Sequence, residues 1–162
     1  MKATSPYGTT IQVRSQRHRE LVDVTAQVRA AVRRSGVADG LCCIYVPHTT
    51  AGLTINENAD PDVAADLLRW AVEALGDERR FRHWEGNAGG HILSSLFGCS
   101  TTVPVRGGDL ALGRWQAIYL VEGDGPRERT LHVTLIPGAA PPRDAPAAPA
   151  AGPAKTPIEP EA

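Results

Sequence analysis

The chain has 162 residues and a formal net charge of −1, because 17 Lys and Arg residues nearly balance 18 Asp and Glu residues. This length predicts a single domain, and the mixed charges give no indication of a nucleic acid or a membrane surface as a partner. The longest apolar run, 41–46, is far shorter than the roughly 20 residues of a membrane-spanning helix, and the N-terminus lacks a signal-peptide pattern. Three cysteines, an odd number, favour a reducing cytoplasm.

Alternation of apolar and polar residues predicts the first two strands, at 9–14 and 20–24. We expect Thr25 to cap a short helix that ends at Gly36, because Thr is favoured before a helix and Gly after one. The run 41–46 is apolar throughout, which predicts a strand covered on both faces.

A second strand, 52–57, is expected to lie beside the strand at 41–46. Asp60 then has the properties of a helix cap, with Pro61 at the first helical position. Apolar residues follow at helical spacing, and we expect this helix to end before Gly76.

A third helix is expected to start at Asn87 and to end before Gly98. The remaining strands are predicted at 101–105, near Leu110, at 115–122 and at 127–136. This order of elements predicts an α+β fold with a mostly antiparallel sheet or sandwich and three short helices. We expect the domain to cover residues 5–137, and the Ala- and Pro-rich segment 138–162 to form a disordered tail.

Three of the five histidines lie in two short polar runs, 48–60 and 83–91. His48 directly follows a predicted buried strand, where a rigid element can hold a side chain at a cleft; the alternative is a histidine satisfied by backbone groups. In the second run, His83, Glu85, Asn87 and His91 surround a predicted helix start. Their spacing matches no familiar zinc motif, so either a metal or ligand site or a polar capping loop is possible.

Alternation along 52–57 gives the two faces of that strand different properties. Thr54, Asn56 and Asn58 share one face, which predicts either a hydrogen-bonding wall for a ligand or a solvated surface. Glu57 falls on the apolar face. A carboxylate there is either a base with a raised pKa or the partner of an arginine.

Small residues open the third helix. Gly89 and Gly90 leave backbone N–H groups accessible at the positive end of the helix dipole, which suits an anion; close packing of the helix start is the alternative. Arg106, Arg114, Arg127 and Arg129 flank later turns, and arginine suits bidentate contact with phosphate; the alternative is that they form solvated surface. Of these we select Arg127 as the phosphate-binding candidate, and Gln116 as a candidate for a hydrogen bond in a pocket.

Read in order, these runs resemble the YjbQ family, also called the secondary thiamine-phosphate synthase family. The segments that carry the resemblance are 48–63, 83–91, 98–116 and 122–129, so it covers nearly all of the domain. The resemblance implies an α+β homotrimer with clefts near the subunit boundaries. It also implies a metal site on His48, His83 and His91, and weak thiamine-phosphate synthase activity.

We therefore expect a transferase that binds a phosphate-bearing small molecule beside a divalent ion, zinc or magnesium. The expected catalytic residues are Glu57, Glu85, Asn56 and Asn58, and the expected substrate-binding residues are Asn87, Gly89, Gly90, Gln116 and Arg127. The alternatives are a metal-dependent phosphate-ester hydrolase and a trimeric metal- or ligand-binding protein without catalytic activity.

Overall fold

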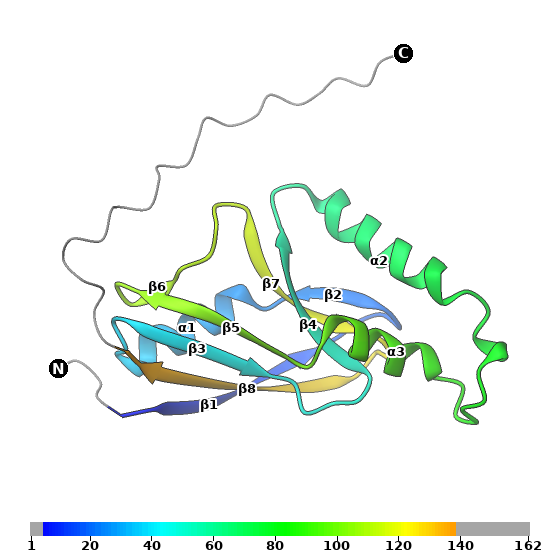
Figure 1. The fold of residues 1–162 in the computed structure, drawn as a ribbon, viewed down its shortest axis with the longest axis horizontal. Coiled ribbons are helices and arrows are strands. Elements are labelled where there is room, and N and C mark those ends of the chain that lie inside the picture. The colour runs from blue at the N-terminus through cyan, green and yellow to red at the C-terminus, as the bar shows by residue number, and fades with distance from the viewer. Residues whose placement is uncertain (1–4, 139–162) are drawn as a thin grey trace, which may run out of the picture.

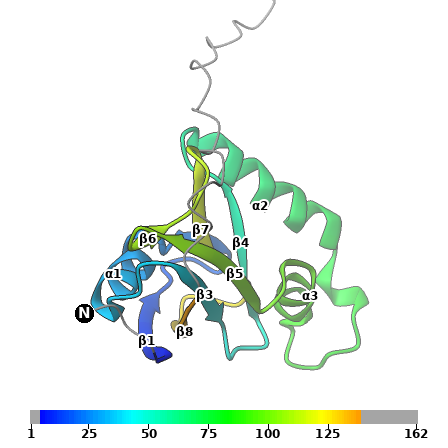
Figure 2. The same ribbon diagram turned by 60° about the vertical axis from the view of Figure 1, so that its left-hand side comes forward.

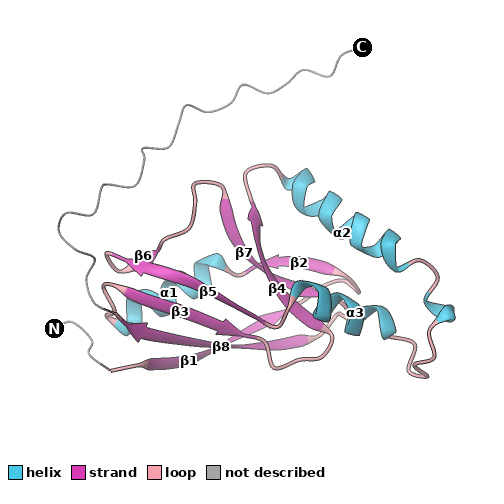
Figure 3. Ribbon diagram, in the orientation of Figure 1, coloured by secondary structure: helices cyan, strands magenta, loops and turns pink. Residues whose placement is uncertain are grey.

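A computed structural model describes residues 5–138 of the chain, which form an α+β domain with two antiparallel sheets and three α-helices (Figures 1 and 3). The expected α+β class is confirmed. Residues 139–162, where we predicted a disordered tail, lie outside the described part of the chain. Within the described part, no helix has the length and apolar character needed to cross a membrane.

The larger sheet has five antiparallel strands in the order β1-β8-β3-β5-β6. Its strands are β1 (Tyr7–Arg14), β3 (Gly40–Tyr45), β5 (Ser100–Arg106), β6 (Asp109–Leu110) and β8 (Glu128–Pro137). The smaller sheet has the order β2-β7-β4 and is also antiparallel. Its strands are β2 (Glu20–Asp23), β4 (Ala51–Glu57) and β7 (Gln116–Glu122).

The expectation that the strand at 52–57 lies beside the strand at 41–46 is wrong. β3 pairs with β5 and β8 in the larger sheet, whereas β4 pairs with β7 in the smaller one. Pro47 follows β3 and has no N–H to continue the ladder, so the chain leaves the sheet and crosses to the second. The crossing segment, 46–50, carries His48 and forms one wall of the site described below.

The main core lies between the two sheets and includes α1 (Thr25–Ser35). Val28, Ala31 and Val32 of this helix are fully buried against both sheets. Contrary to expectation, Thr25 is not the cap of α1. It lies inside the helix, and its hydroxyl accepts a hydrogen bond from the backbone N–H of Ile118, so it fastens α1 to β7.

The expectation that the strand at 41–46 is covered on both faces is also wrong for the single chain. Burial along β3 alternates, with Cys42 and Ile44 fully buried but Leu41 and Tyr45 43% and 48% exposed. The exposed face of the larger sheet therefore presents large apolar side chains to the outside.

The other two helices lie on the outside of the smaller sheet (Figure 2). α2 (Pro61–Leu75) begins as expected, since the carboxylate of Asp60 accepts a hydrogen bond from the N–H of Asp62 at 2.9 Å. α3 (Ala88–Phe97) packs on β4, where the hydroxyl of Ser94 donates to the carbonyl of Ala51 at 2.8 Å. A short turn of helix, η1 (Glu78–Arg80), lies between them. This packing brings the second polar run next to the first.

Candidate ligand-binding site

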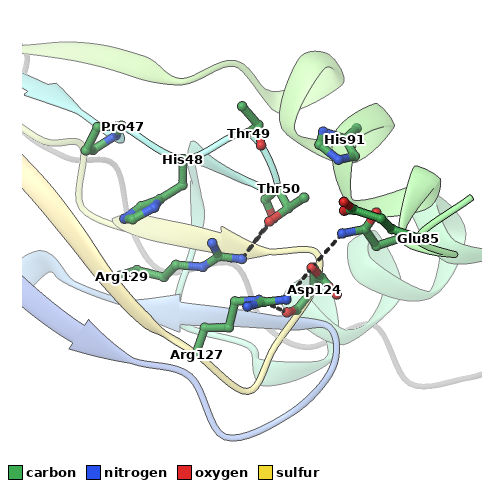
Figure 4. Close-up of a pocket in the computed structure, with 10 residues that line it drawn as sticks. Pro47, His48, Thr49, Thr50, Glu85, His91, Asp124, Arg127 and Arg129 are labelled. Atoms are coloured by element: carbon green, nitrogen blue, oxygen red, sulfur yellow. Dashed lines mark hydrogen bonds and ion pairs between the residues drawn. The ribbon is translucent and has the colours of Figure 1, made fainter. Parts of the chain in front are cut away.

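A cavity of about 340 Å³ lies where the 46–50 crossing, the start of α3 and the β7–β8 turn meet (Figure 4). Its walls come from segments far apart in the sequence, and most of its lining side chains are polar. They are Pro47, His48, Thr49, Thr50, Glu85, Asn87, His91, Asp124, Arg127 and Arg129. A cavity of this size accommodates a small molecule.

A buried ion pair forms the floor of the cavity. Arg129 and Glu122 are 4% and 0% exposed, and the guanidinium donates through Nε and Nη2 to the two carboxylate oxygens. Ser15 and the backbone N–H of Asp124 also donate to Glu122, and Arg129 Nη2 donates to the hydroxyl of Thr50. Burial alone would raise the pKa of Glu122, but these hydrogen bonds outweigh it and hold that pKa below its usual range.

His48 lies above this pair with one ring nitrogen already engaged. The backbone N–H of Thr130 donates to Nε2 of His48 at 2.8 Å. Burial, followed by the positive charge of Arg129, lowers the pKa of His48. The ring is therefore neutral near pH 7, and its proton is assigned to Nδ1 because Nε2 accepts.

The second polar run supplies the opposite wall. The rings of His83 and His91 meet edge to face at 5.1 Å, and Nε2 of His83 lies 3.6 Å from Oε2 of Glu85. Asn87 precedes α3, and its side-chain amide donates to Asp124 at 2.9 Å instead of capping the helix. Its side-chain oxygen is buried and has no hydrogen-bond partner within the described residues.

The three expected metal ligands do not form a set that fits a metal ion. Across residues 5–138, no three His, Cys, Asp or Glu side chains are grouped closely enough to hold one. Nε2 of His48 accepts from Thr130, so this nitrogen has no lone pair free for a cation. The rings of His83 and His91 lie together, whereas Nε2 of His48 is used by the backbone N–H of Thr130.

The second expected group, Asn56, Glu57, Asn58 and Gln116, lies away from the cavity. β4 starts at Ala51 beside the cavity and continues for six more residues, which carries Glu57 about 20 Å away. Asn58 donates to Asp23 and accepts from the hydroxyl of Tyr119, at 2.8 and 2.7 Å. Because β4 is extended, it separates these residues from the histidines, and in the single chain their side chains have structural roles.

Local contacts account for the side-chain oxygens of the other two residues at this end of β4. Oδ1 of Asn56 accepts from the N–H of Glu57, and Oε1 of Gln116 accepts from the N–H of Gly113. Neither side chain lines the cavity.

The glycines at the start of α3 serve packing, not anion binding. The N–H of Gly89 donates to the carboxylate of Glu78, which is paired with Arg19, so the protein's own anion occupies the helix end. A Cβ on Gly90 would lie 2.9 Å from the carbonyl oxygen of Gly123. Close approach of two backbones therefore requires glycine here.

Sequence reasoning missed the floor of the cavity, although a signal was present. Arg129 is in phase with Leu131, Val133 and Leu135, the buried residues of β8, and Glu122 ends the buried run of β7. A charge in an apolar phase predicts a buried pair.

A second cavity, of about 440 Å³, adjoins the first. Pro47, His48, Thr49 and His91 line both cavities and so form the wall between them. The second cavity has a more apolar lining, completed by Tyr45, Val46, Ser94, Ser95 and Cys99. The chain thus has two adjacent cavities of ligand size on either side of two histidines.

The fold and these cavities define an α+β domain with a histidine-lined cleft of ligand size between its two sheets and its third helix. A family model described as UPF0047 protein YjbQ-like matches residues 9–138, and the chain belongs to this YjbQ family. A UPF0047 protein of Methanocaldococcus jannaschii is 46% identical over 125 residues, which cover 77% of this chain and 91% of the relative. The UPF0047 protein YugU of Bacillus subtilis is 46% identical over 128 residues, 78% of this chain and 97% of the relative.

Solved structures show the same fold. A YbjQ-like protein of unknown function from Sulfolobus solfataricus superimposes with a TM-score of 0.79 at 37% identity, covering 83% of this chain and 99% of that one. A YjbQ/UPF0047 family protein from Clostridium acetobutylicum gives a TM-score of 0.75 at 43% identity, covering 79% and 99%.

Proposed function

We propose that the protein is a transferase that joins two small molecules, at least one of them phosphorylated, with weak thiamine-phosphate synthase activity. The observation that carries this proposal is the pair of adjacent cavities that share His48 and His91. A two-substrate reaction needs two neighbouring binding places, whereas hydrolysis needs one and a water molecule. The resemblance to the secondary thiamine-phosphate synthase family supplies the particular reaction.

The chemistry of this reaction suits a site built from fixed donors. The thiazole nitrogen forms a bond to the methylene carbon of hydroxymethylpyrimidine diphosphate, and the bond from that carbon to the diphosphate oxygen breaks. Pyrophosphate leaves with the electron pair, and no proton has to be transferred. Catalysis then depends on holding the two rings in line and on stabilising the departing oxyanion.

The residues that line the cavities divide between these tasks. His48 and Asn87 both present polar groups to the first cavity, and Arg127 contributes positive charge to it. Oε2 of Glu85 lies 3.6 Å from Nε2 of His83, whose ring meets that of His91 edge to face, and we assign to Glu85 the orientation of the His83 ring. The expected divalent ion stays a prediction, because the described residues do not bring three ligands together for it.

The coupling reaction tests the proposal directly. We expect the full chain, given both substrates, to form thiamine phosphate and pyrophosphate in equal amounts. His91→Asn is expected to slow coupling by about tenfold or more, because the wall between the two substrates is disturbed. Asp66→Asn on α2, in an exposed ion pair with Arg69 outside both cavities, is the control.

Other outcomes identify the alternatives. Release of pyrophosphate or phosphate without coupling would favour a phosphate-ester hydrolase. Ligand binding without any turnover would favour a non-catalytic binding protein. Elemental analysis of the parent protein and of His91→Asn tests the predicted ion. A parent protein without metal, or equal metal content in the parent and the variant, contradicts the prediction.

We also propose that the protein is a homotrimer in the cytoplasm. Leu41, Tyr45 and Ile136 are all more than 40% exposed and lie on one face of β3 and β8, where Leu41 and Ile136 are paired in register. A second copy over this face would give β3 the cover on both sides that its apolar sequence predicts. Cys42, Cys43 and Cys99 are all free thiols, which suits a reducing compartment.

A further inference from the structure

The guanidinium of Arg129 carries one hydrogen-bond donor, Nη1, that no described residue accepts. Its Nε and Nη2 donate to Glu122 and Thr50, but Nη1 makes no hydrogen bond within the described residues. The side chain is 95% buried, and it lines the cavity, so the free nitrogen opens only onto that space. In Figure 4 this nitrogen points between His48 and Thr50.

We infer that Nη1 of Arg129 is the anion-binding group of the cavity and that it holds a phosphoryl oxyanion of the ligand. A buried ion pair contributes little to stability compared with apolar residues of the same volume, so stability does not explain it. Guanidinium is well suited to phosphate because it is planar, always charged and carries several donors. The inference rests on the proposed function only in taking this cavity as the ligand site.

The surroundings of Arg129 hold Nη1 in place before a ligand arrives. Glu122 fixes the guanidinium through two hydrogen bonds and is itself held by Ser15 Oγ at 2.9 Å and the N–H of Asp124 at 2.8 Å. Thr50 accepts from Nη2 at 2.9 Å. The donor therefore needs no reorganisation on binding, which favours affinity.

His48 provides a second donor beside Arg129. Because Nε2 accepts from Thr130, the neutral ring carries its proton on Nδ1 and can donate it to a ligand oxygen. Donors that approach from the floor and from a wall suit a tetrahedral phosphoryl group better than a planar carboxylate.

The remaining charges of the cavity are compatible with this role. Arg127, expected to hold phosphate, uses Nε and Nη2 for the backbone carbonyl and the carboxylate of Asp124, so it mainly neutralises that carboxylate. Asp124 also accepts from Asn87. Glu85 is the remaining lining carboxylate, and it lies on the His91 side of the cavity.

Binding of inorganic anions tests the inference without a coupling assay. Calorimetric titration of the full chain is expected to show binding of inorganic pyrophosphate and phosphate, and no binding of acetate at the same concentration. Arg129→Lys keeps the charge opposite Glu122 but removes Nη1. It is expected to weaken pyrophosphate binding by about tenfold or more, which is typical for the loss of a charge-assisted hydrogen bond. Arg29→Lys, at an ion pair with Asp109 outside the cavity, is the control.

A second measurement uses the unaltered chain, in case Arg129→Lys does not fold. The side-chain nitrogen resonance of Arg129, followed by NMR, is expected to shift on addition of pyrophosphate. Absence of any such shift, absence of pyrophosphate binding, or binding by folded Arg129→Lys within twofold of the parent each overturns the inference. Pyrophosphate binding through Arg129 without coupling would leave the inference intact and remove the proposed function. Coupling activity in the parent, together with unchanged pyrophosphate binding in Arg129→Lys, would leave the proposed function intact and overturn the inference about Arg129.

Discussion

At the scale of single residues, the site depends on a carboxylate that never meets the solvent. Glu122 is fully buried and accepts four hydrogen bonds, from Arg129, Ser15 and the N–H of Asp124. A buried charge is tolerated only when it is paired and its remaining lone pairs are used. Loss of this one charge would leave Arg129 uncompensated beneath the cavity.

We therefore expect Glu122→Gln to lower the free energy of unfolding at pH 7 by about 3 kcal/mol or more. Ser15→Ala, which leaves the ion pair in place, is expected to cost about 1 kcal/mol. Urea denaturation of both variants measures the difference. Equal and small losses would contradict the assigned role of the pair.

The pH dependence of stability follows from the lowered pKa of Glu122. A carboxyl group whose pKa is lower in the folded state stabilises the protein fully above its unfolded pKa, and this contribution is lost as the pH falls through the folded pKa. The stability difference between the parent and Glu122→Gln is thus expected to be constant near neutral pH and to shrink in acid below the usual glutamate range. Denaturation curves at several pH values measure it; a difference that grows in acid would contradict the assignment.

Asn58 tests the separation of the two polar groups. It bridges Asp23 and the hydroxyl of Tyr119, far along β4 from the cavity. Asn58→Ala is expected to lower the free energy of unfolding by about 1–2 kcal/mol, because two partners lose a hydrogen bond. Coupling activity of the folded variant, measured well below its unfolding temperature, is expected to stay within about twofold of the parent. If Asn58→Ala loses coupling activity but keeps the stability of the parent, Asn58 takes part in the site and the separation is wrong.

At the scale of elements, the start of α3 decides the shape of one cavity wall. Asn87 turns its side chain to Asp124, Glu78 occupies the helix end, and Gly90 lies against the backbone of Gly123. The start of α3 therefore packs closely against the β7–β8 turn. This contact brings His91 to the same space as His48.

Gly90→Ala is expected to destabilise the protein by about 1–3 kcal/mol, although alanine favours a helix over glycine by about 1 kcal/mol. The added Cβ would lie 2.9 Å from the carbonyl oxygen of Gly123 and 3.1 Å from the Cβ of Thr50, so a backbone must move. Gly8→Ala is the control, because a Cβ at Gly8 meets open space. Thermal unfolding of both variants measures the effect, and a stabilised Gly90→Ala would contradict the packing.

Sequence reasoning was accurate for elements whose signals are local. The cap at Asp60, the proline that follows it and the glycines after the helices depend on contacts within a few residues, so they identify α1, α2 and α3 correctly. The predicted role of Thr25 as a cap is wrong because its hydroxyl accepts from the N–H of Ile118, more than ninety positions away in the chain. A partner that distant leaves no trace in the local pattern.

At the scale of the whole molecule, most strands that are adjacent in sequence belong to different sheets. The chain crosses between the two sheets at every connection between consecutive strands except the one from β5 to β6. Two of these crossings, 46–50 and 123–127, meet in space and carry lining residues of the cavity. The cleft is thus a consequence of the topology.

The exposed apolar face of the larger sheet makes the assembly testable. We expect the parent chain to have a mass in solution of three times its 17.2 kDa. The double substitution Leu41→Lys with Ile136→Lys places charges on the face proposed to be covered, and is expected to yield monomers. Trp70→Lys is the control, an exposed apolar residue of α2 outside that face. Light scattering after gel filtration measures all three. A parent that is monomeric, or a double variant that stays trimeric, contradicts the proposed interface.

The residues of this chain, read alone, determined the α+β class, the three helices and the family resemblance, and they singled out His48, Asn87 and His91, which line one cavity in the structure. These features depend on local propensity, on alternation and on composition, which are properties of neighbouring residues. Tertiary structure decided which polar residues share a cavity. It separated Asn56, Glu57 and Asn58 from the histidines along an extended strand, and it placed Arg129 beneath His48. Such proximity depends on the order of strands in two sheets, and that order is set by long-range packing.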